Sequence, residues 1–291
     1  MTRRSTKTAP QSLNHSITQS LHGVRIGVIG SGTMGQALIK GLLAAGLPPK
    51  AVRAADADAA IRKTAGRRFS VRVTDDNVSI ARWADVVILA VKPQQVPELI
   101  AQLRPHLTLR HLVISIAAGI TLRWLMGRLP GVALARVMPN LPATVGAGFS
   151  AVTWGRAMRP RHRRMALAIF QAVGEAVELP ERYFDAITAV SGSGPAYVFF
   201  LVQAWEEAAR ALGLPKDIAA AAIRRTLEGS VRLLQASEAP ASVLISRVAS
   251  KGGTTEAALK VFATRRLAAV FAEALRAAAR RSKQLSWSSG G

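Results

Sequence analysis

The feature that most constrains this chain is a glycine-rich segment, Val24–Gly35, which reads Val-Arg-Ile-Gly-Val-Ile-Gly-Ser-Gly-Thr-Met-Gly. Its apolar start predicts a short buried strand, and Gly30, Gly32 and Gly35 follow at the G-x-G-x-x-G spacing. Gly30 permits a tight turn, Gly32 lets a ligand approach the backbone, and Gly35 lets the next helix pack against the strand. Because the N-terminus of that helix faces the loop, we interpret the segment as a pyrophosphate-binding turn rather than a plain glycine-rich turn.

Apolar runs alternate with helical patterns as far as Pro180, which is typical of βα units. The expected strands are Val24–Ile29, Ala51–Ala55, Val71–Val73, Asp85–Val91, His111–Ala117, Ala133–Val137 and Phe149–Thr153. The expected helices are Gln36–Ala45, Ile61–Arg68, Val96–Leu103 and Thr121–Leu129, the last with Thr121 as its cap. We therefore predict an α/β fold with an N-terminal Rossmann-type doubly wound sheet, in which ligands bind beyond the carboxyl ends of the strands.

Only helical patterns follow Pro180. They cover Asp185–Val190, Pro195–Leu212, Pro215–Gln235, Ala241–Val248, Glu256–Phe262 and Leu267–Ser282. The segment Ala196–Val202 is apolar on every face, so it has to be buried all round. A helical segment of this size cannot easily bury such a helix alone. We therefore predict a subunit interface in this half of the chain.

Composition narrows the possible functions. The chain has no cysteine, which excludes disulfides, thiolate metal ligands and a cysteine nucleophile, and we expect no metal site. The net charge is +22, but the basic residues are scattered and lack interleaved aromatics, so we favour a solvated surface over nucleic-acid binding. Residues 1–22 lack the apolar core of a secretory signal, and Ala196–Val202 is too short to span a bilayer. We expect a cytoplasmic protein without a membrane segment.

Two further loops have the composition of binding sites. Val248–Glu256, Val-Ala-Ser-Lys-Gly-Gly-Thr-Thr-Glu, opens a helix, and Gly252 and Gly253 expose successive N–H groups there. Together with the helix dipole they form a nest for a carboxylate or phosphate, although a capping box with two turn glycines explains the pattern equally well. Ala189–Tyr197, Ala-Val-Ser-Gly-Ser-Gly-Pro-Ala-Tyr, has two glycines and two serines before the apolar helix, and a simple N-cap also explains it.

The motifs gain specificity from their order along the chain. That order is Gly30–Gly35, Ala90–Pro93, Ser115–Gly119, Arg136–Asn140, Ser191–Tyr197 and Ser250–Thr255. The set, from about Val24 to Ser282, closely resembles the pyrroline-5-carboxylate reductase family. The resemblance implies hydride transfer from a reduced nicotinamide to the C=N bond of 1-pyrroline-5-carboxylate, giving L-proline. Three alternatives stay open: a β-hydroxyacid dehydrogenase, a reductase of another cyclic imine, and a non-catalytic dinucleotide or nucleic-acid binder.

The resemblance also implies the organisation of the chain. A disordered leader (1–23) would precede a dinucleotide-binding Rossmann domain (24–180). An all-α dimerisation and substrate domain (181–285) and a flexible tail (286–291) would follow. The protein would therefore be a homodimer or a higher homo-oligomer through its C-terminal helices.

The same resemblance implies the site residues. The cofactor-binding residues would be Ile29, Gly30, Ser31, Gly32, Thr33, Met34, Gly35, Asn77, Ala90, Val91, Lys92, Pro93, Ala117, Ala118 and Gly119. The substrate-binding residues would be Glu238, Ser250, Gly252, Gly253, Thr254 and Thr255, with the Thr255 hydroxyl at the imine nitrogen as the catalytic group. A protonated imine is already electrophilic, so this chemistry needs orientation more than a strong acid. The histidines fit that interpretation: His15 and His22 fall in or beside the leader, and we expect His106, His111 and His162 at the surface.

Residues in or after the second expected strand bear on the choice between NAD and NADP, and two motif residues differ from the family pattern. Asp56 follows the glycines at about the separation at which an acid binds the ribose 2′-hydroxyl of NAD, although it fits a helix cap as well. Arg53 and Arg62 are near enough in sequence to meet a 2′-phosphate, and the family commonly prefers NADPH, so we expect NADP, with NAD possible. Lys251 replaces the proline of the family's usual Ser-Pro-Gly-Gly, and Leu141 the threonine of its Pro-Asn-Thr-Pro.

Overall fold

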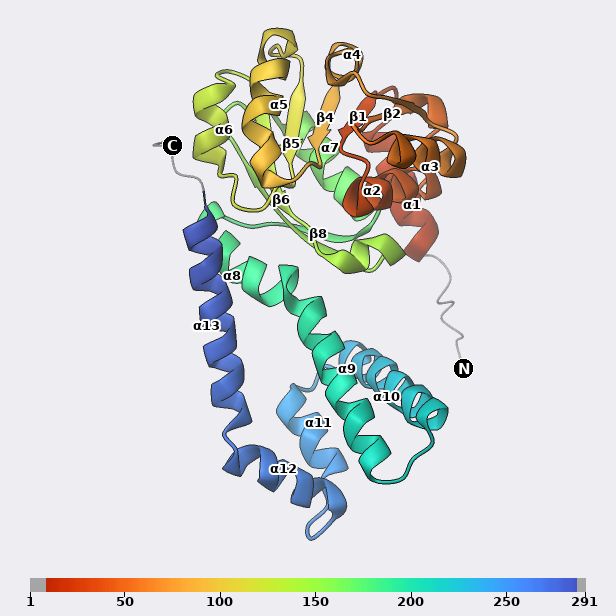
Figure 1. Cartoon of the computed structure of the whole chain (residues 1–291), viewed down its shortest axis with the longest axis vertical. Coiled ribbons are helices and arrows are strands. Elements are labelled where there is room, and N and C mark those ends of the chain that lie inside the picture. The colour runs from red at the N-terminus through yellow and green to blue at the C-terminus, as the bar shows by residue number, and fades with distance from the viewer. Residues whose placement is uncertain (1–8, 287–291) are drawn as a thin grey trace, which may run out of the picture. The chain divides into compact units, whose positions relative to one another are not determined.

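The computed structural model describes residues 9–286, and within them the chain divides into two compact units. The first unit runs to Gly192 and takes in the end of the last helix from Ala279, and the second is Ser193–Ala278. The compact units thus divide after Gly192, whereas the predicted domain boundary lies at residue 180. Figure 1 shows the strands and helices of the first unit and the helices of the second.

The first unit is built on an eight-stranded sheet with the order β3-β2-β1-β4-β5-β6-β7-β8. Its strands are β1 (Ile26–Ile29), β2 (Val52–Ala55), β3 (Arg72–Thr74), β4 (Val86–Leu89), β5 (Leu112–Ser115), β6 (Ala133–Met138), β7 (Gly148–Trp154) and β8 (Gly174–Glu178). All neighbours are parallel except β6 and β7. The strand order reverses direction between β1 and β4, which is the switch point where doubly wound sheets bind ligands. The predicted α/β class is confirmed.

Helices cover both faces of the sheet, which explains why β1, β4 and β5 are buried along their whole length. One face packs against α2 (Thr33–Ala44), α3 (Ala59–Phe69) and α7 (Pro160–Gln171). The other face packs against α4 (Asn77–Trp83), α5 (Val96–Leu103) and α6 (Leu122–Arg128). Thr121 caps α6 as predicted, because its hydroxyl accepts from the backbone N–H of Trp124 at 3.1 Å.

The predicted disordered leader is wrong for residues 9–20. Ala9–Ser20 form helix α1, and Ile17 is 1% exposed within the core that α7 also lines. The segment is rich in Ser, Thr and Gln, but its apolar residues Ile17, on α1, and Leu21, directly after it, are both buried in that core. The remainder of the leader, residues 1–8, and most of the predicted tail, residues 287–291, lie outside the described residues.

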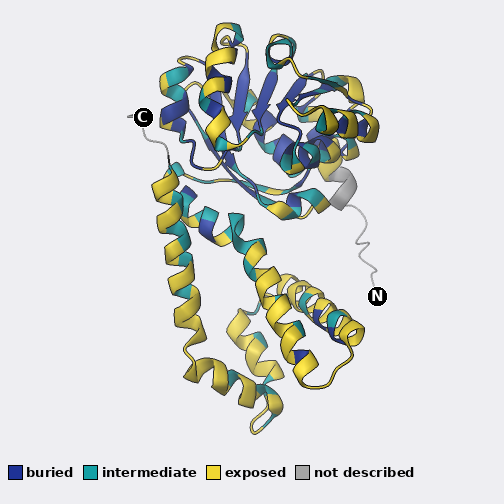
Figure 2. Cartoon of the chain, in the orientation of Figure 1, coloured by how far each residue is buried: buried dark blue, intermediate teal, exposed yellow. Residues whose placement is uncertain are grey.

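The chain leaves the sheet through α8 (Phe184–Ile187) and a π-helical turn, Thr188–Gly192. The second unit then contains α9 (Gly194–Ala211), α10 (Lys216–Ala236), α11 (Ala241–Val248), α12 (Thr254–Thr264) and most of α13 (Leu267–Leu285). Its buried apolar cluster is small and consists of Ala209, Ala219 and Ile223. Figure 2 shows the contrast in colour, with buried strands in the first unit and mainly exposed helices in the second.

Candidate functional site

The glycine turn has the geometry that its spacing predicts. Gly30 adopts a φ of +95°, and a Cβ there would lie 2.5 Å from the carbonyl oxygen of Ala90. A Cβ on Gly35 would collide with the carbonyl oxygen of Gly30, so α2 packs against the turn only with glycine at that position. A Cβ on Gly32 meets nothing within 4 Å, because Gly32 faces an open cavity at the N-terminus of α2. This open space beside free helical N–H groups fits a pyrophosphate.

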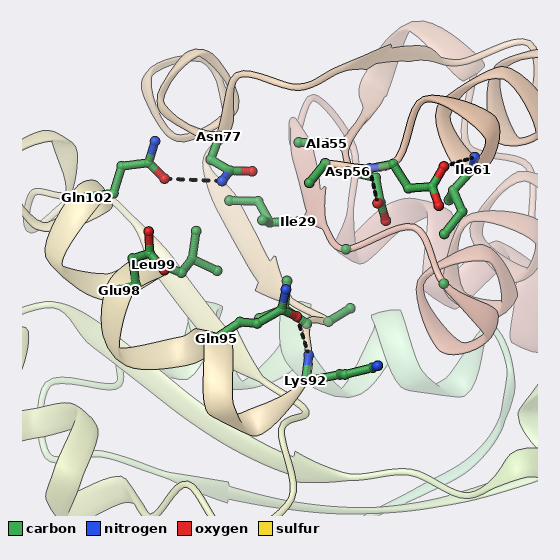
Figure 3. Close-up of a pocket in the computed structure, with 16 residues that line it drawn as sticks. Ile29, Ala55, Asp56, Ile61, Asn77, Lys92, Gln95, Glu98, Leu99 and Gln102 are labelled. Carbon is green, nitrogen blue, oxygen red and sulfur yellow. Dashed lines mark hydrogen bonds between the residues drawn. The ribbon is translucent and has the colours of Figure 1, made fainter. Parts of the chain in front are cut away.

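A cavity of about 480 Å³ lies over the carboxyl ends of β1, β2 and β4. Residue pairing places Ile29, Ala55 and Leu89 level with one another, so the residues that follow them reach the same edge of the sheet. Of the predicted cofactor residues, those in the lining are Ile29, Gly30, Gly32, Asn77, Ala90, Val91 and Lys92. Figure 3 shows Asn77, Asp56 and Lys92 around this cavity.

Helix α5 and its N-cap residue Gln95 supply a wall of this cavity that we did not predict. Gln95 at the cap and Glu98, Leu99 and Gln102 on the helix all line it (Figure 3). Their spacing of i, i+3, i+4 and i+7 places them on one face of the helix, which was the signal available in the sequence. Gln102 accepts a hydrogen bond from the Asn77 side chain at 3.1 Å.

A second cavity, of about 250 Å³, lies over the carboxyl ends of β4, β5 and β6. The residues that line it are Met34, Ala90, Val91, Lys92, Pro93, Ile116, Ala117, Ala118, Met138 and Pro139. Ala90, Val91 and Lys92 line both cavities, so the two adjoin at the end of β4. Together they form a continuous site across the switch point, which suits an elongated ligand with two ends.

Four predicted cofactor residues lie outside these two cavities: Gly35, which packs under the turn, and Ser31, Thr33 and Gly119. Ser31 is fully buried in the turn, and Thr33 lines a separate cavity of about 220 Å³ on the other side of α2. Gly119 has a φ of +79°, and a Cβ there would lie 2.5 Å from the carbonyl oxygen of Leu285 at the end of α13. The structure therefore gives Gly119 a packing role that the sequence did not indicate.

The Asp56 carboxylate lines the first cavity, whereas the nearby Arg53 and Arg62 side chains make other contacts. The Asp56 carboxylate accepts from the backbone N–H of Ser31 at 2.6 Å and from that of Asp58 at 3.0 Å. Arg62 donates to the carbonyl oxygens of Asp56 and Ala57 at 2.9 and 2.8 Å. Arg53 lies with its guanidinium carbon 4.2 Å from the centre of the Trp83 ring. Neither arginine lines the cavity.

Two motifs after β5 connect the sheet to the segment that follows it. Arg136 is buried on β6 and donates to Glu181 at 2.9 Å, and the same carboxylate oxygen accepts from the Leu122 backbone at 2.8 Å. Asn140 donates to the Ser191 hydroxyl at 3.1 Å and accepts from the Phe149 backbone at 2.9 Å. These contacts give the Arg136–Asn140 and Ser191 motifs a role in fixing the π-helical turn to the sheet.

The prediction of surface histidines is wrong for His111. Its ring is fully buried at the start of β5, where Nδ1 accepts from the Thr108 backbone at 2.8 Å and Nε2 lies 3.1 Å from the carbonyl oxygen of Ala81. Burial lowers the pKa of the His111 ring, and the Arg110 cation lowers it further. His111 therefore links α4 to β5 as a neutral group.

The second candidate loop lies in the helical unit. Gly252 has a φ of +75°, and Gly253 is the N-cap of α12. The Gly252 N–H donates to the Glu256 carboxylate, so a capping contact forms, and it shows that this backbone accommodates a carboxylate. Ser250, Thr254 and Glu238 are exposed, and Thr255 is half-buried.

The described residues hold no metal-binding cluster and one long apolar helical stretch. No group of three or more His, Cys, Asp or Glu side chains in residues 9–286 is placed to hold a metal ion. One helical stretch, Glu181–Ala211, is long and apolar enough to cross a membrane by length and composition, with a mean hydropathy of 1.2. Length and composition alone are weak evidence for a membrane span, and only 6% of this apolar stretch is buried within the single chain.

The sheet order, the glycine turn at the switch point and the cavity beside it define a Rossmann-type dinucleotide-binding protein. Residues 25–119 match a family model described as NADP oxidoreductase, coenzyme F420-dependent, and residues 181–285 match one described as pyrroline-5-carboxylate reductase dimerisation. The chain is 38% identical to a pyrroline-5-carboxylate reductase of Synechocystis over 90% of its own length and 98% of the relative's. The chain belongs to the pyrroline-5-carboxylate reductase family.

Solved structures agree with this assignment. A pyrroline-5-carboxylate reductase from Coxiella burnetii superposes with a TM-score of 0.85 at 35% identity, covering 91% of this chain and 99% of that one. Pyrroline carboxylate reductase from Plasmodium falciparum, solved with NADP bound, gives a TM-score of 0.84 at 25% identity, covering 91% of this chain and 99% of that one.

Proposed function

We propose that this protein is an NAD(P)H-dependent pyrroline-5-carboxylate reductase, which reduces the C=N bond of 1-pyrroline-5-carboxylate to give L-proline. The observation that carries the proposal is similarity to a reductase across 90% of the chain, which includes both the glycine turn and the loop before α12. Residues 24–180 then bind the dinucleotide, and residues 181–285 form the dimer and hold the substrate.

The first unit supplies the cofactor site. The N–H groups at the start of α2 face the pyrophosphate, and the missing side chain of Gly32 leaves room for it. Asn77 lies at the adenosine ribose, and Ala90–Pro93 with Ala117 and Ala118 enclose the nicotinamide end in the second cavity. When bound, the reduced dinucleotide supplies the hydride that adds to the imine carbon.

The loop before α12 supplies the substrate site. The N–H groups of Gly252 and Gly253 and the dipole of α12 bind the substrate carboxylate. The contact of the Gly252 N–H with the Glu256 carboxylate supports this role for Gly252, whereas the Gly253 N–H donates to the Ser250 carbonyl oxygen at 3.0 Å and has to be released to take part. Ser250, Thr254 and Glu238 lie around the ring, and the Thr255 hydroxyl hydrogen-bonds the ring nitrogen. As the hydride adds to carbon, the C=N π pair moves to that nitrogen, so orientation by Thr255 favours the amine product.

The test is oxidation of reduced cofactor by the purified protein after addition of pyrroline-5-carboxylate. The Thr255→Ala variant should lower kcat by about tenfold or more, with cofactor binding unchanged. Thr264→Ala, which removes the same hydroxyl from the other end of α12, is the matched control and should keep the parent rate. Absence of cofactor oxidation by the parent protein would refute the assignment, and full activity of Thr255→Ala would remove Thr255 from the mechanism.

The family model over residues 181–285 is named for dimerisation, which supports a homo-oligomer. The apolar stretch Glu181–Ala211 then packs against a second copy of this chain rather than against lipid. We assign the protein to the cytoplasm, where a supply of reduced dinucleotide exists, and we assign the charge of +22 to solvated faces rather than to nucleic-acid binding.

A further inference from the structure

We propose that Asp56 makes NADH the more efficient cofactor of this chain, by accepting a hydrogen bond from the 2′-hydroxyl of the adenosine ribose. The inference rests on the proposed reductase function and concerns preference, since the glycine turn takes the pyrophosphate of either dinucleotide. It assigns Asp56 as the residue that sets the preference.

The position of the Asp56 carboxylate supports this role. Asp56 directly follows β2, lines the first cavity, and lies level with the turn because Ala55 pairs with Ile29. One of its oxygens accepts from the Ser31 N–H at 2.6 Å and the other from the Asp58 N–H at 3.0 Å. Two backbone contacts therefore fix the carboxylate at the rim of the pyrophosphate turn, and each oxygen keeps a lone pair for a ribose hydroxyl.

The two arginines that would favour a 2′-phosphate are engaged elsewhere. Arg62 holds two backbone carbonyl oxygens of the loop after β2 and lies 3.4 Å from the Asp75 carboxylate. Arg53 is stacked on Trp83, 4.2 Å from its ring centre. To meet a phosphate, Arg62 would have to release both carbonyl groups, and Arg53 would have to leave an aromatic face.

The charge around the cavity points the same way. Its lining contains three carboxylates, Asp56, Asp58 and Glu98, against one ammonium group, Lys92. Figure 3 shows Lys92 apart from Asp56, and Lys92 lies where the first cavity adjoins the second. A chain of net charge +22 thus presents a locally acidic surface where NADPH would place a dianionic phosphate.

The test compares the binding of NADH and NADPH to the full-length protein by fluorescence titration without substrate, and then their kcat/KM values with pyrroline-5-carboxylate. We expect the parent protein to bind NADH with a Kd about tenfold or more below that for NADPH. Asp56→Asn keeps an acceptor for the Ser31 N–H and removes the charge, so it should bring the two Kd values within about threefold.

Asp58→Asn is the matched control. Asp58 lines the same cavity, but its Oδ1 caps α3 by accepting from Ala60 and Ile61, and asparagine also caps helices. Because the Asp58 carboxylate is engaged as the cap of α3 and adds only to the general acidity of the cavity, Asp58→Asn should change the Kd ratio by less than about twofold. Three results would overturn the proposal. The parent protein could bind NADPH more tightly than NADH, Asp56→Asn could raise both Kd values by the same factor, or Asp58→Asn could change the Kd ratio as much as Asp56→Asn does.

Failure of the reductase assignment gives a different result. If the cofactors bind with the expected ratio but the imine causes no oxidation, the assignment is wrong and the role of Asp56 in binding stands. If the imine is reduced with NADPH preferred, the assignment stands and the role of Asp56 is wrong. If neither dinucleotide binds, both proposals are overturned.

Discussion

The two units handle apolar residues in opposite ways. The sheet unit buries its large side chains, including Ile26, Leu38 and Phe170, at 0% exposure, because helices cover both faces of its sheet. In the helical unit Phe199 and Phe200 remain 60% and 72% exposed within the single chain (Figure 2). A doubly covered sheet completes its own core, whereas these helices require a second surface of the kind that a dimer interface supplies.

The largest expected effect breaks that second surface. Phe200→Glu should convert the oligomer to monomers and abolish reductase activity, as measured by light scattering on a sizing column and by turnover. Burying a phenylalanine contributes about 1.5–3 kcal/mol. In a twofold-symmetric dimer the substitution removes Phe200 from both protomers, so the free energy lost is about twice that value. The dissociation constant of the dimer should therefore rise by at least about 100-fold.

Leu109→Glu is the control for this variant. Leu109 is 68% exposed, but it lies on the sheet unit, so the same substitution there should leave the oligomer intact. A Phe200→Glu protein that remains oligomeric would show that the exposed face of α9 is not the interface. The comparison between the two units would then lose its main support.

The next prediction compares the loss of unfolding free energy when one ion pair is removed from each unit. Glu181→Ala should lower the free energy of unfolding by about 3–5 kcal/mol, because it leaves the Arg136 guanidinium buried without its carboxylate and the Leu122 N–H without its acceptor. Urea unfolding followed by circular dichroism measures the change. Glu228→Ala removes the partner of Arg225 and Arg232, whose side chains are 83% and 76% exposed, and should cost under about 1 kcal/mol. Equal losses would contradict the distinction.

The next expected effect is a pH dependence of stability. It should be confined to the sheet unit, because all five histidines precede Gly192. Burial lowers the pKa of His111 and, with Arg159 and Arg161, that of His162. Near pH 6 the unfolded chain therefore binds more protons than the folded chain, so stability falls as pH drops through about 6.5. The urea midpoint of the sheet unit should decrease from pH 7.5 to pH 5.5.

His111→Gln tests the source of that dependence. The variant should show a flatter midpoint against pH, whatever its absolute stability, and His162→Gln should flatten it further. His15→Gln, at an exposed position on α1, should keep the parent slope. An unchanged slope in His111→Gln would mean that its buried ring does not contribute to the pH dependence.

Much of the sheet unit could be predicted because its signals are local. The apolar run of β4 and the glycine spacing after β1 each specify an element without reference to the rest of the chain. Helix α7 and strand β8 were not predicted, because their local apolar signals are weak. Helix α7 begins with a run of basic residues, Arg161 to Arg164, and β8 is a half-exposed edge strand, so their apolar signals are weak.

The site was harder to predict, because its residues come together only in three dimensions. Gly30 and Gly35 carry a steric signal that the sequence shows directly, and both pack as predicted. The burial of His111 depends on α4, a helix that the sequence analysis did not predict. The engagement of Arg62 with two carbonyl groups of its own loop is likewise a tertiary contact, which no spacing rule indicates.

The smallest expected effects separate the contributions of the two units to one reaction. Lys92 lines the cavities of the sheet unit, and Lys251 is exposed beside the Gly252–Gly253 turn of the helical unit. Lys92→Gln should raise KM for the dinucleotide about twofold to fivefold and leave KM for the imine unchanged, whereas Lys251→Gln should do the reverse. Both increases should shrink as salt is added, because exposed charges are screened over about 10 Å at 0.1 M ionic strength. Steady-state kinetics at two salt concentrations measure these KM values. A variant in which both KM values change would contradict the assignment of the dinucleotide to the sheet unit and the imine to the helical unit.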